Sequence, residues 1–129
     1  MIVLYPPKGA TPWIGRIDRD SREELVAALQ EAATEIRKRD LQLVHDAKAG
    51  HIGGALGAAD ILTTLYLHSL NVDPEHYDDP DRDRFILSKG HIAGILYVTL
   101  AARGLIDPAV LPTFLQPELF RVYECWLCS

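Results

Sequence analysis

The sequence predicts an α/β fold for a single domain in which helices predominate. Apolar residues recur every three or four positions from Leu25 to Val44, which indicates a long amphipathic helix. A short apolar run at residues 84–87 is followed by a glycine turn and by renewed helical spacing from His91. Strand, glycine turn and helix in this order are typical of parallel-sheet α/β proteins, which bind ligands at the carboxyl end of the strand.

The composition is that of an ordinary globular domain. Of the 129 residues, 48% are hydrophobic and 24% are charged, and this length suits one domain at most. The net charge of -5 argues against a nucleic-acid partner, which requires clustered Lys and Arg. No apolar run approaches the roughly 20 residues that span a bilayer, and the N-terminus lacks the pattern of a secretory signal. We therefore expect a cytoplasmic protein that binds no membrane.

Residues 1–20 predict an irregular N-terminal arm. Prolines and glycines interrupt every possible helix or strand in this segment. Trp13 and Ile14 are the only anchors that we expect to hold the arm against the domain.

The first helix is predicted to begin after Ser21 and to run for six to seven turns. Ser21 and Glu24 have the spacing of a capping box. Gly50 is expected to end the helix, as a glycine just past the last turn often does. The charged face of the helix is interpreted as solvated, with pairs such as Glu35 and Arg39 four residues apart. This face carries Glu31, Glu35, Arg37, Lys38, Arg39 and Asp40.

Three glycines follow the first helix. Gly53, Gly54 and Gly57 permit a tight turn and the close approach of a neighbour or a ligand. From glycine content alone, a plain turn between two helices is the favoured interpretation, because neither phosphate-loop spacing matches. The second helix, Ala58 to Leu70, is apolar on nearly all sides, so we expect it to be buried on several of them by protein beyond this chain.

The second half of the sequence carries the strand that defines the fold class. Residues 84–87 predict a buried strand, and Ser88 to Gly90 a turn. The next helix should run from His91 to Gly104. Asp107 is followed by Pro108, an order typical of an N-cap residue with proline at the first helical position. It predicts a short helix to about Leu115.

Two of the five histidines differ from the others in their local sequence. His51 and His91 each follow a glycine at a predicted turn, so both can reach one pocket if the turns face each other. Imidazole can donate a hydrogen bond to a phosphate or a sugar oxygen and can move protons near neutral pH. For His45, His68 and His76 we expect ordinary surface or core roles.

Several motifs in the same order resemble the transketolase family. Residues 49–54 (AGHIGG) are similar to that family's S-G-H-x-G-G/A turn, with Ala49 in place of the usual serine. Residues 70–74 (LNVDP) and 81–91 (DRDRFILSKGH) resemble its next two signatures. The resemblance extends from about Leu25 to Phe114 and is greatest to the subtype that is split into two polypeptides.

The resemblance implies the N-terminal part of a parallel-sheet domain that binds thiamine diphosphate at a dimer interface. The family transfers a two-carbon ketol unit from a ketose phosphate to an aldose phosphate. By resemblance, His91 contacts the cofactor diphosphate, His51 faces the sugar and assists proton transfer, and Gly54 lies close to the cofactor. The implied partners are sugar phosphates and a C-terminal transketolase subunit, in a homo- or hetero-oligomer.

The resemblance ends at about Pro117. The family continues into a G-H-P motif and then into Gly-Asp-Gly and an asparagine, whose side chains hold Mg²⁺, and neither motif occurs in this sequence. Thiamine diphosphate and Mg²⁺ are both implied as cofactors, yet we predict no metal ligand in the chain. We therefore expect a truncated subunit that does not catalyse the reaction alone.

The predicted organisation has three parts: an arm at residues 1–20, a partial transketolase N-terminal domain at 21–117, and an atypical tail at 118–129. Both cysteines, Cys125 and Cys128, lie in the tail. A C-x-x-C pair suits a redox or a zinc site, but no strand precedes the pair and no histidine lies within 30 residues of it. We interpret the pair as two thiols without a function.

Two alternatives to a transketolase subunit remain at this point. One is a related enzyme of the deoxyxylulose-phosphate synthase type, although the Ser88–His91 sequence favours transketolase. The other is a non-catalytic interaction module, or a truncated product, which pairs with a full-length subunit through its apolar second helix and does not bind the cofactor.

Overall fold

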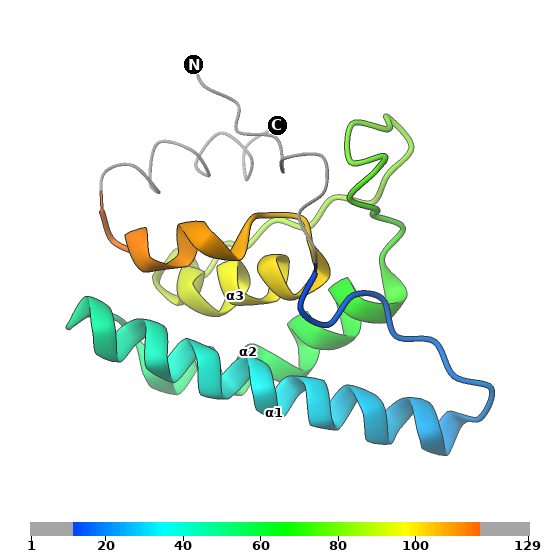
Figure 1. The fold of residues 1–129 in the computed structure, drawn as a ribbon, viewed down its shortest axis with the longest axis horizontal. Helices are drawn as coiled ribbons and strands as arrows, with labels where there is room; N and C mark the ends of the chain where they lie inside the picture. The colour runs from blue at the N-terminus through cyan, green and yellow to red at the C-terminus, as the bar shows by residue number, and fades with distance from the viewer. Residues whose placement is uncertain (1–11, 117–129) are drawn as a thin grey trace.

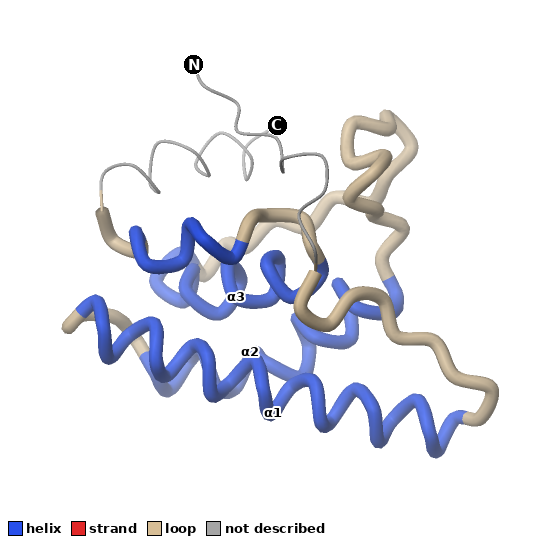
Figure 2. The backbone as a smooth tube through the Cα atoms, viewed as in Figure 1, coloured by secondary structure: helices blue, strands red, loops and turns tan. Residues whose placement is uncertain are grey.

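The computed structural model describes residues 12–116 as a bundle of helices (Figures 1 and 2). Three α-helices pack against one another, and three short helical turns join or extend them. The elements, in chain order, are α1 (Arg22–Ala47), α2 (Ile52–Thr64), the π-helical turn η1 (Leu65–Ser69), the 3₁₀ turn η2 (Gly90–Ile92), α3 (Ala93–Arg103) and the 3₁₀ turn η3 (Pro108–Thr113). No helix between residues 12 and 116 is long and apolar enough to cross a membrane.

Helix α1 begins where the sequence predicts, but it ends earlier. The Ser21 side chain accepts a hydrogen bond from the Glu24 amide at 3.2 Å, which caps the first turn. At the other end Lys48, not Gly50, adopts the left-handed cap conformation, with φ 57°. Gly50 follows in the link at φ 140°, where a Cβ atom would lie 2.9 Å from a methyl group of Val44. The glycine is needed for the link, and the prediction that it ends the helix is wrong.

The glycines at positions 53, 54 and 57 lie inside helix α2 and not in a turn, which corrects the sequence-based interpretation. The turn consists only of residues 48–51, and α2 begins directly after His51. Gly54 faces a neighbour: a Cβ atom there would lie 3.0 Å from the Cγ2 methyl of Ile92. Gly53 and Gly57 face open space. Only Gly54 is therefore required for packing.

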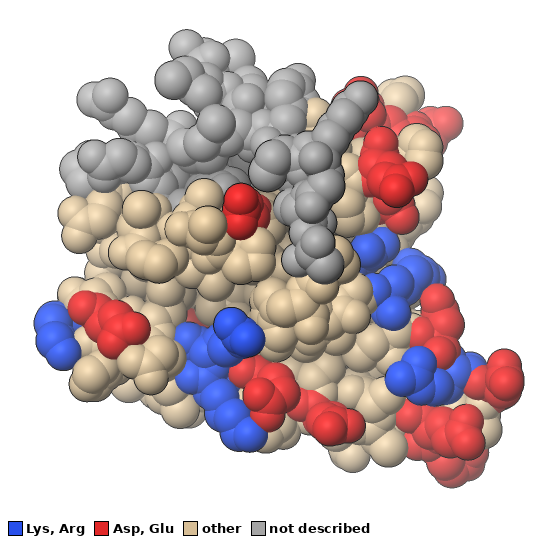
Figure 3. Space-filling view, in the orientation of Figure 1, with Lys and Arg blue, Asp and Glu red and all other residues tan. Residues whose placement is uncertain are grey.

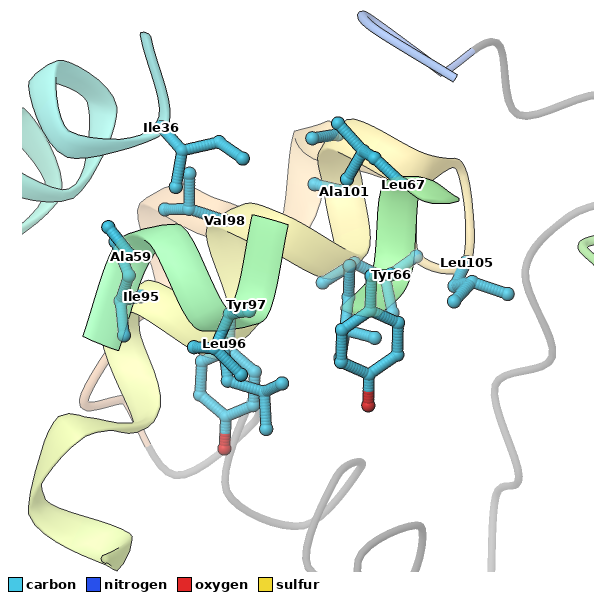
Figure 4. Packing of buried hydrophobic residues seen from close by; sticks show 14 of the residues in the cluster. Ile36, Ala59, Tyr66, Leu67, Ile95, Leu96, Tyr97, Val98, Ala101 and Leu105 are labelled. Atoms are coloured by element: carbon cyan, nitrogen blue, oxygen red, sulfur yellow. The ribbon is translucent and has the colours of Figure 1, made fainter. Parts of the chain in front are cut away.

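The core lies where α1, α2 and α3 meet (Figure 4). Helix α3 is the central element, because Gly94 to Arg103 are all buried. Ile36 of α1 and Leu67 of η1 reach it from two other segments and are fully buried. Each such side chain contributes roughly 1.5–3 kcal/mol through burial of its apolar surface. Within residues 12–116 the second helix is buried only on its core-facing side, and Ile61 remains 63% exposed, so the predicted burial on several sides is not reached here.

Residues 12–20 form neither helix nor strand, and residues 1–11 lie outside the described part of the chain. Trp13 packs under the guanidinium of Arg39, whose Cζ atom is 4.2 Å from the ring centroid. The Ile14 amide donates to a carbonyl of α3 at 3.1 Å. Ile17 is a third anchor that the sequence analysis missed: it is buried and its amide donates to the Leu67 carbonyl at 2.7 Å.

The predicted strand at residues 84–87 does not form among the described residues. These residues lie in the loop between η1 and η2 (Figure 2), with Phe85 and Leu87 half-buried and Ile86 73% exposed. The Phe85 ring packs edge-on against Tyr66, with centroids 5.9 Å apart. A strand requires a neighbouring backbone with which to exchange hydrogen bonds, and no segment between residues 12 and 116 supplies one. The short apolar run by itself could not show whether a partner strand is present.

Helix α3 and η3 follow the predicted order. Gly104 ends α3 in the left-handed conformation, with φ 87°. The Asp107 side chain accepts from the Ala109 amide at 2.9 Å and caps η3, as its sequence predicts. The short helix is of the 3₁₀ type and ends at Thr113, two residues before the predicted Leu115.

Charged residues on α1 have more specific roles than a solvated face implies. The guanidinium of Arg37 binds both carboxylate oxygens of Asp60, at 3.2 and 2.6 Å, and also the Leu56 carbonyl, so it ties α1 to α2. Glu35 pairs with Lys38 at 2.6 Å, not with Arg39 as predicted. Acidic and basic side chains alternate along the face shown in Figure 3, so neither sign forms a continuous patch there.

Candidate functional site

His51 and His91 lie side by side, although 40 positions separate them in the sequence. His51 is the N-cap residue of α2, and His91 lies in the η2 turn directly before α3. Their ring centroids are 5.0 Å apart and the rings meet at 75°, edge to face. Both side chains are exposed. The two turns therefore face each other, which is the condition under which both histidines can reach one pocket. The chemical roles of the two residues stay predictions.

The contact between α2 and η2 gathers the other groups of the site around Gly54. A Cβ atom at Gly54 would lie 3.5 Å from Lys89 Nζ and 3.9 Å from His91 Nε2, besides the contact with Ile92. The absent side chain therefore lets the ammonium and the imidazole approach the first turn of α2. Sequence analysis did not single out Lys89, although it directly precedes Gly90 and His91 in the motif on which the resemblance rests.

The site is rich in hydrogen-bond donors. Lys89 forms no ion pair in the described part of the chain, so its ammonium is free to bind an anion. The N-cap residue His51 uses no side-chain atom to cap α2, and backbone N–H groups in the first turn of a helix lack intrahelical acceptors. Ammonium, imidazole and helix N-terminus together favour an anionic ligand such as a phosphate.

The remaining histidines lie outside this pair. His45 contacts Asp46 at 3.1 Å, and His68 Nδ1 lies 3.0 Å from the Ile17 carbonyl oxygen. His76 belongs to an exposed group with Asp73 and Glu75 in which one donor atom of each lies within 4.8 Å of the others; it is the only such group between residues 12 and 116. The predicted cysteine pair lies outside the described residues.

A cavity of about 290 Å³ lies between the C-terminal half of α1 and η3, away from the histidine pair. It is mostly apolar, and none of the four residues of the site lines it. Its lining residues are Arg39, Gln42, Leu43, Asp46, Ala47, Pro108, Leu111, Pro112 and Phe114.

Asp40 is a buried acid that sequence analysis left on the charged face of α1. It is fully buried, and neither carboxylate oxygen has a hydrogen-bond partner among the described residues. It faces α3: a Cβ atom at Gly94 would lie 2.9 Å from its Oδ1. Burial raises the pKa of Asp40 from its ordinary value of 3.8 to about 6. Its burial is visible only once α1 is packed.

The comparisons with known proteins identify the family. Residues 28–111 match the family model described as the transketolase, thiamine diphosphate binding domain. The chain belongs to the transketolase family. The matched residues include all four residues of the site, His51, Gly54, Lys89 and His91.

Proteins similar to this transketolase-family chain are named transketolases or transketolase subunits. It is 44% identical over 88 residues to an apulose-4-phosphate transketolase subunit of Phocaeicola vulgatus, covering 68% of this chain and 31% of that protein. It is 38% identical over 97 residues to a 6-deoxy-6-sulfo-D-fructose transketolase subunit of a Clostridium species, covering 75% and 35%. It is 34% identical over 89 residues to human transketolase, covering 69% and 14%. The chain thus spans about a third of the bacterial subunits.

The two α2 glycines provide a matched pair for testing the packing of the site. Gly54→Ala places a methyl group 3.0 Å from Ile92, whereas Gly57→Ala places it in open space. We expect Gly57→Ala to stabilise the chain by roughly 0.5–1 kcal/mol, because alanine is the better helix former. Gly54→Ala should instead destabilise it by about 1–2 kcal/mol through overpacking. Urea unfolding of both variants measures the difference. Equal stabilisation by the two substitutions would show that Gly54 is not a packing requirement.

The raised pKa of Asp40 predicts a fall in stability with rising pH. Below pH 4 the carboxyl is protonated in both states, and between about pH 4 and 6 only the unfolded chain releases the proton. The free energy of unfolding should therefore fall through this window, by up to roughly 3 kcal/mol at 1.36 kcal/mol per pKa unit. Asp40→Asn should lose this step. Urea unfolding at pH 4, 5, 6 and 7 measures it, and identical profiles for the two proteins would contradict the assignment.

Proposed function

We propose that this chain is the N-terminal, cofactor-binding part of a thiamine-diphosphate-dependent transketolase subunit. The observation that carries the proposal is the convergence of His51, His91 and Lys89 around Gly54 within the residues that match the family. In this reaction a two-carbon ketol unit passes from a ketose phosphate to an aldose phosphate. The relatives that are named as single subunits of a transketolase support a chain that works with a second, C-terminal subunit.

The residues of the site fit an anionic cofactor. Thiamine diphosphate supplies the carbanion chemistry of ketol transfer when it is bound. In the proposal, His91 donates a hydrogen bond from its imidazole to a diphosphate oxygen, and Lys89 adds a charge-assisted one. His51 faces the sugar, where its imidazole takes up or returns the proton of a substrate hydroxyl. Gly54 leaves the space that these groups share.

The side chains around Gly54 do not fit Mg²⁺ as a ligand set. Mg²⁺ binds carboxylate or amide oxygens together with phosphate oxygens. The side chains gathered around Gly54 are an ammonium and imidazoles, which are not such ligands. The exposed group at Asp73 is already engaged, since its Oδ1 accepts the Glu75 amide and its Oδ2 lies 3.6 Å from Arg103. We propose that any Mg²⁺ ligands are not contributed by residues 12–116.

The parallel sheet of the α/β fold is part of the same proposal. Helix-rich packing in residues 12–116 agrees with a fragment of such a domain, with Ile86 exposed in the loop where the strand was predicted. We propose that residues 84–87 pair with other strands when the remainder of a transketolase domain is present, in a cytoplasmic homo- or hetero-oligomer that acts on sugar phosphates.

A non-catalytic interaction module is the second candidate function. The outer side of α2 favours it, because Ile52 and Ile61 are 43% and 63% exposed. Such a module would pair with a full-length subunit through this apolar side and would not need the donors around Gly54. Relatives named transketolase support transketolase over the deoxyxylulose-phosphate synthase alternative.

Calorimetric titration of the full chain with thiamine diphosphate separates the two candidates. We expect the wild-type chain to bind, and His91→Gln and Lys89→Gln each to weaken binding about tenfold or more, since hydrogen bonds to charged groups contribute about 1.5–3 kcal/mol. His76→Gln, which changes an exposed histidine outside the site, is the matched control and should leave the affinity unchanged. A wild-type chain that does not bind the cofactor would favour the interaction module.

Catalysis is predicted to require more than this chain. We expect no ketol transfer by the purified chain with thiamine diphosphate and Mg²⁺, because the Gly-Asp-Gly and asparagine ligands of the family do not occur in the sequence. Product formation from a ketose phosphate and an aldose phosphate, followed by chromatography, measures it. Turnover that His51→Ala abolishes would show that the chain is complete without those ligands.

A further inference from the structure

Asp40 interrupts an otherwise apolar stripe on α1. The buried residues along this side of the helix are Ala32, Ala33, Ile36, Asp40 and Leu43. A carboxyl group in this stripe is costly to bury, because neither of its oxygens has a hydrogen-bond partner among residues 12–116. An apolar side chain would fill the same position without that cost. The position of the carboxyl therefore calls for an explanation outside core packing.

The carboxyl lies against the first turn of α3. Gly94, the second residue of that helix, has no room for a side chain, because a Cβ atom would lie 2.9 Å from Asp40 Oδ1 and 3.2 Å from the Phe114 ring. Helix α3 starts directly after η2, the turn that carries His91. Only two residues separate His91 from Gly94. Movement of this first turn therefore moves the histidine.

Helix α3 lacks a cap of its own. Its N-cap residue is Ile92, which has no acceptor in its side chain, whereas α1 and η3 are capped by Ser21 and Asp107. The first backbone N–H groups of a helix need an outside acceptor and favour a negative charge. The Ala93 amide donates to the Gly90 carbonyl of η2, and no side chain caps the turn. The unpartnered acid of α1 thus lies against a turn without a side-chain cap. The carboxyl can accept hydrogen bonds, and the backbone amides of the turn can donate them.

We propose that Asp40 is a positioning residue for His91: its carboxylate caps the first turn of α3 from the neighbouring helix and thereby sets the orientation of the η2 turn. In the present structure neither carboxyl oxygen makes this bond, and we assign this arrangement to the protonated form. Loss of the proton creates a buried charge, and the carboxyl faces the turn that carries the Gly94 amide. The protonation of Asp40 and the position of His91 are consequently coupled.

Among residues 12–116, no other charged group is placed to offset a charge on Asp40. On its own helix, Arg37 is bound to Asp60 and Arg39 lies over the ring of Trp13. Burial is the sole cause of the raised pKa of Asp40, so no nearby cation contributes to it.

The elements that pack against Asp40 bring no charge either. The first turn of α3 carries no ionisable side chain between His91 and Tyr97, and the Tyr97 ring packs edge-on against Phe114 with centroids 6.2 Å apart. The turn η3, which precedes Phe114, has no ionisable residue. Among residues 12–116, the turn that Asp40 faces at Gly94 therefore offers backbone amides and no charged side chain.

The test is a pH titration of the full chain followed by NMR, without cofactor. In the wild type, the Asp40 carboxyl carbon and the Gly94 amide should titrate with one shared midpoint, and the His91 imidazole signals should shift over the same range. In Asp40→Asn the Gly94 step should be lost and the His91 signals displaced. The imidazole signals of His45 and His76, which lie outside the pair, should stay in place.

His91 is close enough to Gly94 to cause such a step itself, so His91→Gln is the control. The Gly94 step should persist in that variant. Its loss there, or an unchanged Gly94 curve in Asp40→Asn, would overturn the proposal. If Asp40→Asn does not fold, the wild type decides alone, because different midpoints for Asp40 and Gly94 contradict the coupling. The inference rests on the proposed function only in giving His91 a role toward the cofactor, and cofactor binding is measured separately by calorimetry.

Discussion

The close contact of α2 with the η2 turn is the constraint on which the candidate site depends. Gly54 presents no side chain toward Ile92, so the start of α2 and the turn before α3 can approach each other. His51 lies at the end of one element and His91 in the other, and their rings meet only because this contact is short. The Lys89 ammonium enters the same space. The absence of a side chain at Gly54 therefore leaves room for the side chains of Lys89 and His91.

This contact is supported from the opposite side by α1. The helix packs on both α2 and α3, and it carries the guanidinium of Arg37 that binds Asp60 and the Leu56 carbonyl of α2. Asp40, one turn further along, lies against α3. The long helix thus holds the two elements of the site in register, by an ion pair on one and by a buried carboxyl on the other.

The helices were predictable because their signals are local. The Ser21 cap, the apolar spacing that follows it and the left-handed Gly104 each depend on residues within one or two turns. The strand at residues 84–87 was not, because strand formation depends on a partner backbone that the local sequence does not contain. The glycines of α2 were wrongly predicted to form a turn for a related reason. Gly54 is needed because it packs against Ile92, and Ile92 is 38 positions away in the sequence.

The sequence by itself determined the order of the main helices, the pair of candidate histidines and, through its motifs, membership of the transketolase family. Only the tertiary structure decided that His51 and His91 touch, that Lys89 joins them and that Asp40 is buried against Gly94 rather than solvated. The physical reason is the range of the interactions involved. Caps and helical periodicity act within a few residues, whereas burial and the approach of charged groups depend on which elements pack together.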